Sequence, residues 1–136
     1  MIRYVASCFF IASVLAVTPA PSAQLLYVMD RDRVETFGPS GESLGSIGAG
    51  TGISNAFDLA IGPDGNIYVG NDGAGRIDYY TPDGEYLGVF VQPNPPVGRF
   101  FPRSMVFDDQ GLLYAASSSD GVRVFDQNGG ELGVFG

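Results

Sequence analysis

A repeated unit of 43 to 46 residues is the feature that most restricts how this sequence can fold. Its central copy, Phe57–Phe90, contains four short apolar runs, at Leu59–Ile61, Ile67–Val69, Ile77–Tyr80 and Tyr86–Phe90. Pro-Asp-Gly follows the first run and the third, and such turns use proline to preset φ and glycine to accept a left-handed backbone. Runs of this length between turns predict strands rather than amphipathic helices. The central copy is therefore predicted to be a four-stranded antiparallel meander.

The unit recurs on both sides of the central copy. Arg33–Gly48 aligns without gaps with Arg76–Val91 at an offset of 43 residues, and Gly121–Gly136 follows 45 residues later. Met105–Phe107 follows Leu59–Ile61 by 46 residues. Four strands in such a period are what a β-propeller blade requires, so we predict an all-β, open or incomplete propeller of about 2.75 blades. The predicted blades are 25–48, which is partial, and 57–91 and 103–136, which are full.

The first copy begins late, because Leu26–Val28 aligns with the second strand of the central unit. The first blade is therefore expected to lack its first strand. Closed propellers use roughly four to eight blades, so the outer blades would leave open edges. Three explanations stay open: the chain associates with itself and closes the ring, it docks on another propeller segment, or it is a piece of a longer gene product.

Residues 1–23 have the layout of a secretory signal peptide. Arg3 precedes an apolar run, Tyr4–Val17, which is too short to span a bilayer, and small residues follow it. An uncleaved membrane anchor is the alternative. The prediction places the chain outside the cytoplasm, either secreted or periplasmic. Since Cys8 is the one cysteine, the chain without this segment has no disulfide and depends on packing.

The charge and the missing residue types exclude several classes of function. The formal net charge is −8 and the sequence contains no lysine, which argues against nucleic acid and against anionic membrane surfaces as partners. The sequence also contains no histidine. Zinc sites of the usual kind and Ser-His catalytic pairs are therefore not expected.

The segment NIYVGNDGAGRIDYYTPDGEYLGVF resembles the NHL repeat, a propeller blade with an apolar-Tyr-Val segment, an Arg-Ile pair, an Asp-Gly turn and a closing Leu-x-x-Phe-Gly. GRFFPRSMVFDDQG resembles the lead-in to the next blade. The likeness covers nearly all of the chain after residue 23 and implies the broad group of NHL and gluconolactonase-like propellers, with a six-bladed ring. The aspartate that the family has after Tyr-Val is displaced or replaced in each copy here.

Loops between the second and third strands, together with the links between blades, are expected on one face of such a propeller. Oxygen-bearing side chains that converge there would suit calcium, and the resemblance implies a divalent ion that acts on an ester carbonyl. The alternative is that these residues serve only the turns. The candidate metal ligands are Asp30, Asp32, Asn71, Asp72 and Asp120, with Ser117 on the same face.

The irregular segment Val91–Pro102 is stiffened by the three prolines Pro93, Pro95 and Pro96, and two phenylalanines, Phe100 and Phe101, precede its last residue. Packing between blades and recognition of a partner both fit it. The candidate partner-binding residues are Arg99, Phe100, Phe101 and Arg103.

Two functions follow from these observations. The first is a secreted, non-catalytic module that binds a protein or a glycan and uses no cofactor, without membrane attachment once the signal peptide is removed. The alternative is a remnant or subunit of a calcium-dependent hydrolase that resembles gluconolactonases. No catalytic residue is predicted in either case.

Overall fold

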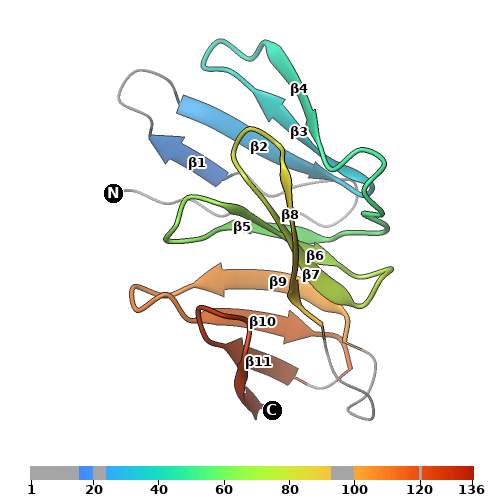
Figure 1. Ribbon diagram of the computed structural model, residues 1–136, viewed down its shortest axis with the longest axis vertical. Coiled ribbons are helices and arrows are strands. Elements are labelled where there is room, and N and C mark those ends of the chain that lie inside the picture. Colours follow the sequence, from blue (N-terminus) through green and yellow to red (C-terminus); the bar gives the residue numbers. More distant parts are fainter. Residues whose placement is uncertain (1–15, 20–23, 93–99, 120) are drawn as a thin grey trace.

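The computed structural model describes residues 16–19, 24–92, 100–119 and 121–136, in which every regular element is a β-strand. Three four-stranded antiparallel sheets follow one another along the molecule (Figure 1). The first sheet has β1 (Ala16–Pro19), β2 (Gln24–Asp30), β3 (Arg33–Phe37) and β4 (Ser43–Ile47). The second has β5 (Asp58–Ile61), β6 (Ile67–Asn71), β7 (Arg76–Tyr80) and β8 (Tyr86–Val91). The third has β9 (Pro102–Phe107), β10 (Leu113–Ser117), β11 (Gly121–Phe125) and β12 (Glu131–Phe135).

The expectation that the first blade lacks its first strand was wrong. β1 pairs antiparallel with β2, with Ala16 opposite Tyr27 and Pro19 opposite Gln24. The physical reason is that the edge of β2 offers unpaired backbone donors and acceptors, which a neighbouring extended segment can satisfy. β1 lies inside the predicted signal peptide, 1–23, and the rest of that segment lies outside the described residues.

The turn chemistry explains why the second sheet forms where the sequence predicts. Each Pro-Asp-Gly turn places its glycine in the left-handed region, at φ 83° for Gly65 and 95° for Gly84. A backbone hydrogen bond closes each turn, from Gly65 N to the oxygen of Gly62 at 3.0 Å and from Gly84 N to that of Thr81 at 2.9 Å. The all-β class and the four-strand meander are confirmed.

Apolar side chains pack in two cores, one on each side of the second sheet. In the first core, Tyr27, Val34 and Ile47 of the first sheet meet Leu59 and Val69 of the second. The second core joins the second and third sheets through Ala60, Tyr68, Ile77, Phe100, Met105, Leu113 and Phe125. Because β5 and β9 lie side by side, the second and third sheets meet along their first strands. No helix long and apolar enough to cross a membrane occurs in the described parts of the chain.

Candidate functional site

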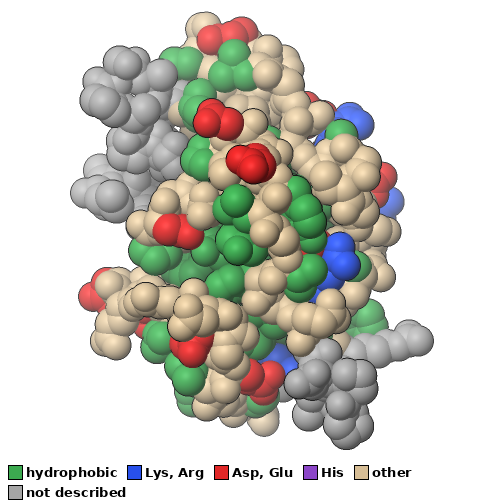
Figure 2. All heavy atoms as spheres, viewed as in Figure 1, with side chains coloured by type: hydrophobic (Ala, Val, Ile, Leu, Met, Phe, Trp, Pro, Cys, Tyr) green, Lys and Arg blue, Asp and Glu red, His purple; other side chains and the backbone are tan. Residues whose placement is uncertain are grey.

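The loops that were expected to carry functional residues lie along one edge of the molecule. The β2–β3 and β6–β7 loops both reach the right-hand edge in Figure 1. Basic side chains gather toward the same edge in Figure 2, whereas acidic ones are spread over the whole visible face.

Arg103 and Asp72 form the main charged contact between the second and third sheets. Arg103, in β9, places its Nε 3.1 Å from Asp72 Oδ1, and its side chain is 43% exposed. Its guanidinium carbon also lies 4.0 Å from the centre of the Phe57 ring, a cation–π contact. Asn55 Nδ2 donates to Asp72 Oδ2 at 3.1 Å. The guanidinium is therefore held at two points and still reaches solvent.

Asp58 lies next to this contact, at the start of β5. Its Oδ2 accepts a hydrogen bond from the Met105 amide of β9 at 2.6 Å. Its Oδ1 is buried without a hydrogen bond from the described residues, and the residue as a whole is 1% exposed. Burial raises the pKa of the Asp58 carboxyl to about 6, and the hydrogen bond from Met105 offsets part of that effect. Through this hydrogen bond the Asp58 carboxyl holds β9 against β5, at Met105, which follows Arg103 by two residues.

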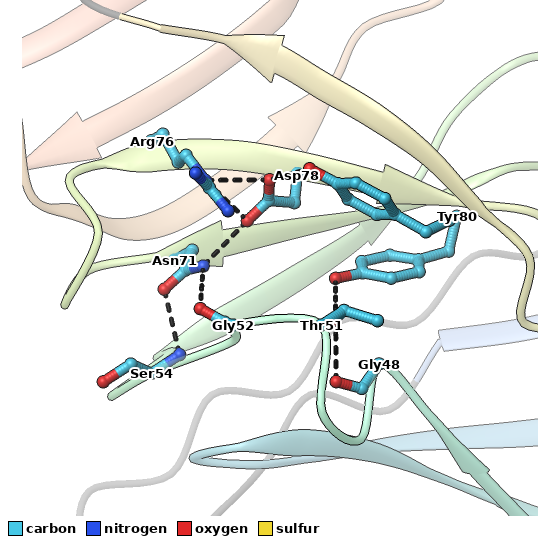
Figure 3. A network of polar contacts seen from close by, with 9 residues as sticks. Gly48, Thr51, Gly52, Ser54, Asn71, Arg76, Asp78 and Tyr80 are labelled. Carbon is cyan, nitrogen blue, oxygen red and sulfur yellow. Dashed lines mark hydrogen bonds and ion pairs between the residues drawn. The ribbon is translucent and has the colours of Figure 1, made fainter.

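Asn71 lies beside Asp72 but faces the interior, as Figure 3 shows. Its Oδ1 accepts from Ser54 N at 3.0 Å. Its Nδ2 donates to the Gly52 oxygen at 3.0 Å and to Asp78 Oδ2 at 2.7 Å. Both ends of the amide are thus occupied, and Asn71 ties the link between the first two sheets to the second sheet.

Asp78 completes this network as a fully buried carboxylate. Arg76 Nε lies 2.9 Å from its Oδ1, and the Tyr86 hydroxyl donates to the same oxygen at 3.0 Å. Thr51 connects the link between the first two sheets to β7, since its hydroxyl lies 2.8 Å from the Tyr80 hydroxyl. The cluster is satisfied by protein groups, so it stabilises the junction and leaves little for a ligand.

The candidate calcium ligands do not converge. Asp30 is paired with Arg33 at 3.4 Å in the first sheet, Asp32 is exposed nearby, and Asp72 is paired with Arg103 in the second. The Asn71 amide oxygen already accepts from Ser54, and Asp120 lies outside the described residues. Within those residues no three His, Cys, Asp or Glu side chains group around a possible metal position. This donor set does not fit calcium, which takes six to eight oxygen ligands.

The candidate partner-binding residues divide into different environments. Phe100 is 1% exposed, and its ring lies 5.8 Å from that of Phe125 and 5.3 Å from the Arg123 guanidinium. Burial in the second core makes Phe100 a packing residue, which corrects its assignment as a partner contact. Phe101 is half-buried, and its backbone bonds to Ser117 and Ser118. Arg103 is accessible, and Arg99 lies outside the described residues.

Sequence reasoning missed Phe57 and Asp58. The signal was present, because Asp58 is an acidic residue directly before the apolar run of a strand that is buried on both faces. A carboxylate at such a place needs a specific partner. Which partner it has depends on β9, 47 residues away in the sequence, and no local pattern gives that information.

Comparisons with known proteins bear on this arrangement. No protein-family model and no curated protein matches the sequence. A gluconolactonase from Xanthomonas campestris matches with a TM-score of 0.57 and 25% identity, over 87% of this chain and 36% of that one. Regucalcin from Agrobacterium tumefaciens, a calcium-binding protein, matches with a TM-score of 0.56 and 20% identity, over 82% and 40%. The chain is a β-propeller segment.

A third match shows how broad the likeness is. Virginiamycin B lyase from Staphylococcus aureus has a TM-score of 0.68 at 14% identity, over 85% of this chain and 38% of that one. The propeller segment spans between 33% and 47% of the length of eight solved chains that it resembles. The comparisons therefore establish the fold, and the chemistry has to be argued from the site.

Proposed function

We propose that the propeller segment is part of a lactonase-like hydrolase, in which Arg103 contacts a small cyclic ester or its hydroxy-acid product. The observation that carries the proposal is the anchored guanidinium, which Asp72 and Phe57 hold while its side chain stays 43% exposed. The gluconolactonase of 25% identity supports the choice of substrate class.

The chemistry of ester cleavage gives this cation a role. Attack on a lactone carbonyl places negative charge on the carbonyl oxygen, and a cation that is already in position stabilises this charge without reorganisation. The product carries a carboxylate, which a guanidinium can bind through two parallel hydrogen bonds. Asp58 is a positioning residue here, because its carboxyl holds the Met105 amide and so fixes the strand that bears Arg103.

The proposal includes the finer features that the sequence predicts. The repeats are of the NHL type, and the segment 1–23 directs the chain to the periplasm or the medium, so that removal of this segment also removes β1. The repeat spacing and the apolar N-terminal run support these two features. Calcium is left out of the proposal, since the described candidate ligands do not converge.

Gluconate binding and gluconolactone hydrolysis test the proposal on the full chain. We expect calorimetry to detect gluconate binding to the unmodified chain, and Arg103→Gln to weaken it more than about tenfold because a charge-assisted bidentate contact is lost. Arg31→Gln is the matched control, since Arg31 is an exposed arginine in the β2–β3 loop at the same edge. Acid release from glucono-δ-lactone is followed at constant pH against the uncatalysed reaction.

Two results would count against the proposed lactonase-like function. Equal gluconate affinity of the Arg103→Gln and Arg31→Gln chains would overturn the assignment of Arg103. Binding without any acceleration of hydrolysis would instead favour the second function, a non-catalytic module for a protein or glycan. One observation supports that second function: the Asn71 and Asp78 side chains at this edge are already bonded within the protein.

A further inference from the structure

A cavity lies at the opposite ends of the inner strands from Arg103. It is a pocket of about 420 Å³ between the β5–β6 turn of the second sheet and the β9–β10 turn of the third. This volume falls within the usual range for small-molecule sites. Tyr68, Phe90 and Phe107 line it together with Asp64, Asp109 and Gln127.

The aromatic side chains form a corner of rings. Tyr68 meets Phe90 with ring centres 4.8 Å apart at 83°, and it meets Phe107 at the same distance and 66°. Tyr79 stacks against Tyr68 at 5.6 Å and 18°. Rings at steep angles to one another turn their negative faces and positive edges in different directions.

Two carboxylates stand at the rim of the same pocket. Asp64 accepts hydrogen bonds from the Tyr68 hydroxyl at 2.9 Å and from the Asn66 side chain at 2.8 Å, and both donors are neutral. Asp109 is exposed and has no hydrogen-bond or ion-pair partner among the described residues. The pocket lining contains no arginine. The turns at this edge lie on the left in Figure 1. On the same side, Figure 2 shows acidic and hydrophobic side chains, and the visible basic side chains lie elsewhere.

The walls of the pocket are fixed by a contact within the third sheet and by one between the second and third sheets. Gln127 Nε2 donates to the Gln110 oxygen at 3.0 Å, which joins the two turns of the third sheet. Gly129, in the same turn as Gln127, lies so close to the Phe90 carbonyl oxygen that a Cβ there would overlap it. Phe90 and Gln127 therefore keep their relative places, and the pocket is preformed.

We propose that this pocket binds a small organic ammonium cation, with the charged nitrogen against the aromatic corner and near Asp64 and Asp109. Aromatic rings attract a cation through their negative faces, and the effect is strongest where water is excluded. The unneutralised carboxylates add a long-range attraction for positive charge and repel anions. The site is separate from that of Arg103, and it requires no lactonase activity.

A pair of isosteric probes tests the role of charge. Choline and 3,3-dimethylbutan-1-ol have the same shape, but only choline is charged, and both are titrated into the full chain by NMR or calorimetry. We expect choline to bind on the order of tenfold more tightly than the neutral alcohol. Asp109→Asn and Phe107→Leu should each weaken choline binding several-fold, with folding checked by circular dichroism.

Asp83→Asn is the matched control, since Asp83 is an exposed turn aspartate that does not line the pocket. It should leave choline binding unchanged. Equal affinity for the two isosteres, tighter binding of methyl glucoside than of choline, or no binding of choline would each overturn the proposal. Arg103→Gln should not alter choline binding. The choline proposal and the gluconate proposal are therefore tested independently of each other.

Discussion

Asn71 shows how one side chain can hold two blades together. The residue is fully buried, and its amide bonds to Ser54, Gly52 and Asp78. If the amide is removed, the Ser54 amide and the Asp78 carboxylate lose a partner in a place that water reaches poorly. Unsatisfied buried groups cost more free energy than the hydrogen bond gained in folding. The residue is therefore expected to matter for stability rather than for binding.

We predict that Asn71→Ala lowers the free energy of unfolding by about 2–4 kcal/mol. Asn128→Ala is the control, because Asn128 is exposed in a turn of the third sheet, and it should change stability by no more than about 0.5 kcal/mol. Urea unfolding followed by circular dichroism measures both. Equal effects of the two substitutions would show that the network in Figure 3 contributes little.

Asp58 gives a prediction about pH. Its pKa is raised by burial from 3.8 to about 6, so between these values the folded chain binds a proton that the unfolded chain releases. Stability from this group is fully present below pH 3.8 and is lost as pH rises through about 6. The loss amounts to about 3 kcal/mol at most.

The measurement compares unfolding of the unmodified chain with Asp58→Asn from about pH 4 to pH 7. Other titrating groups are common to both chains and cancel in the difference. The difference should shift in favour of Asp58→Asn as pH rises. A difference that stays constant over this range would mean that Asp58 does not titrate there.

Among the elements, the turns between the third and fourth strands place equivalent glycines in different surroundings. Gly41 and Gly129 have φ values of 82° and 79°, so both need the left-handed region. A Cβ on Gly41 would meet nothing within 4 Å, whereas one on Gly129 would overlap the Phe90 carbonyl of the neighbouring sheet. The turn of the third sheet is therefore packed against β8, and the turn of the first is free.

This difference predicts the effect of two matched substitutions. Gly41→Ala should cost about 1–2 kcal/mol from backbone strain alone. Gly129→Ala should cost at least about 2 kcal/mol more, because the two sheets must also move apart. Urea midpoints give the comparison. Costs that agree within error would contradict the close packing of this turn against β8.

The strands could be predicted from the sequence because each is bounded by turn residues with a local preference. Leu59–Ile61 and Ile67–Val69 fall inside β5 and β6, and the Pro-Asp-Gly turn sets the register between them. β1 could not be predicted, since its pairing depends on the free edge of β2 and not on a repeat. For the candidate site, the repeat predicts that the β6–β7 loop and the links between blades lie on one face, and in the structure Asp72 and Arg103 are 3.1 Å apart. Their pairing, the role of Phe57 and the burial of Phe100 depend on contacts between sheets.

For the whole molecule, equivalent positions show that the third sheet exposes apolar side chains where the second sheet buries them. Ala60 faces the third sheet and is 5% exposed, whereas its counterpart Val106 is 53% exposed. Phe90 is half-buried against the second core, whereas its counterpart Phe135 is 62% exposed. On the second sheet these positions bury apolar surface against the third sheet. On the third sheet no described residue covers the equivalent positions. We predict that a second copy of the chain covers this face.

A substitution on this face has a natural control. Val106→Asp places a charge where another blade would pack, and Leu44→Asp places one at a leucine that is 54% exposed. The leucines equivalent to Leu44, Leu87 and Leu132, are 38% and 60% exposed, so this position faces solvent in every blade. We predict that Val106→Asp prevents self-association and that Leu44→Asp does not, because burying an unpaired charge is costly.

The most direct test of an incomplete ring with blade-packing faces is the mass of the chain in solution, by light scattering on a sample whose β-structure is verified by circular dichroism. We predict a discrete dimer, with twice the mass of the 14.3 kDa chain, or of its shorter form if the signal peptide is removed. A folded chain that stays monomeric at high concentration would contradict it, because the exposed Val106 and Phe135 face would then be stable without another blade.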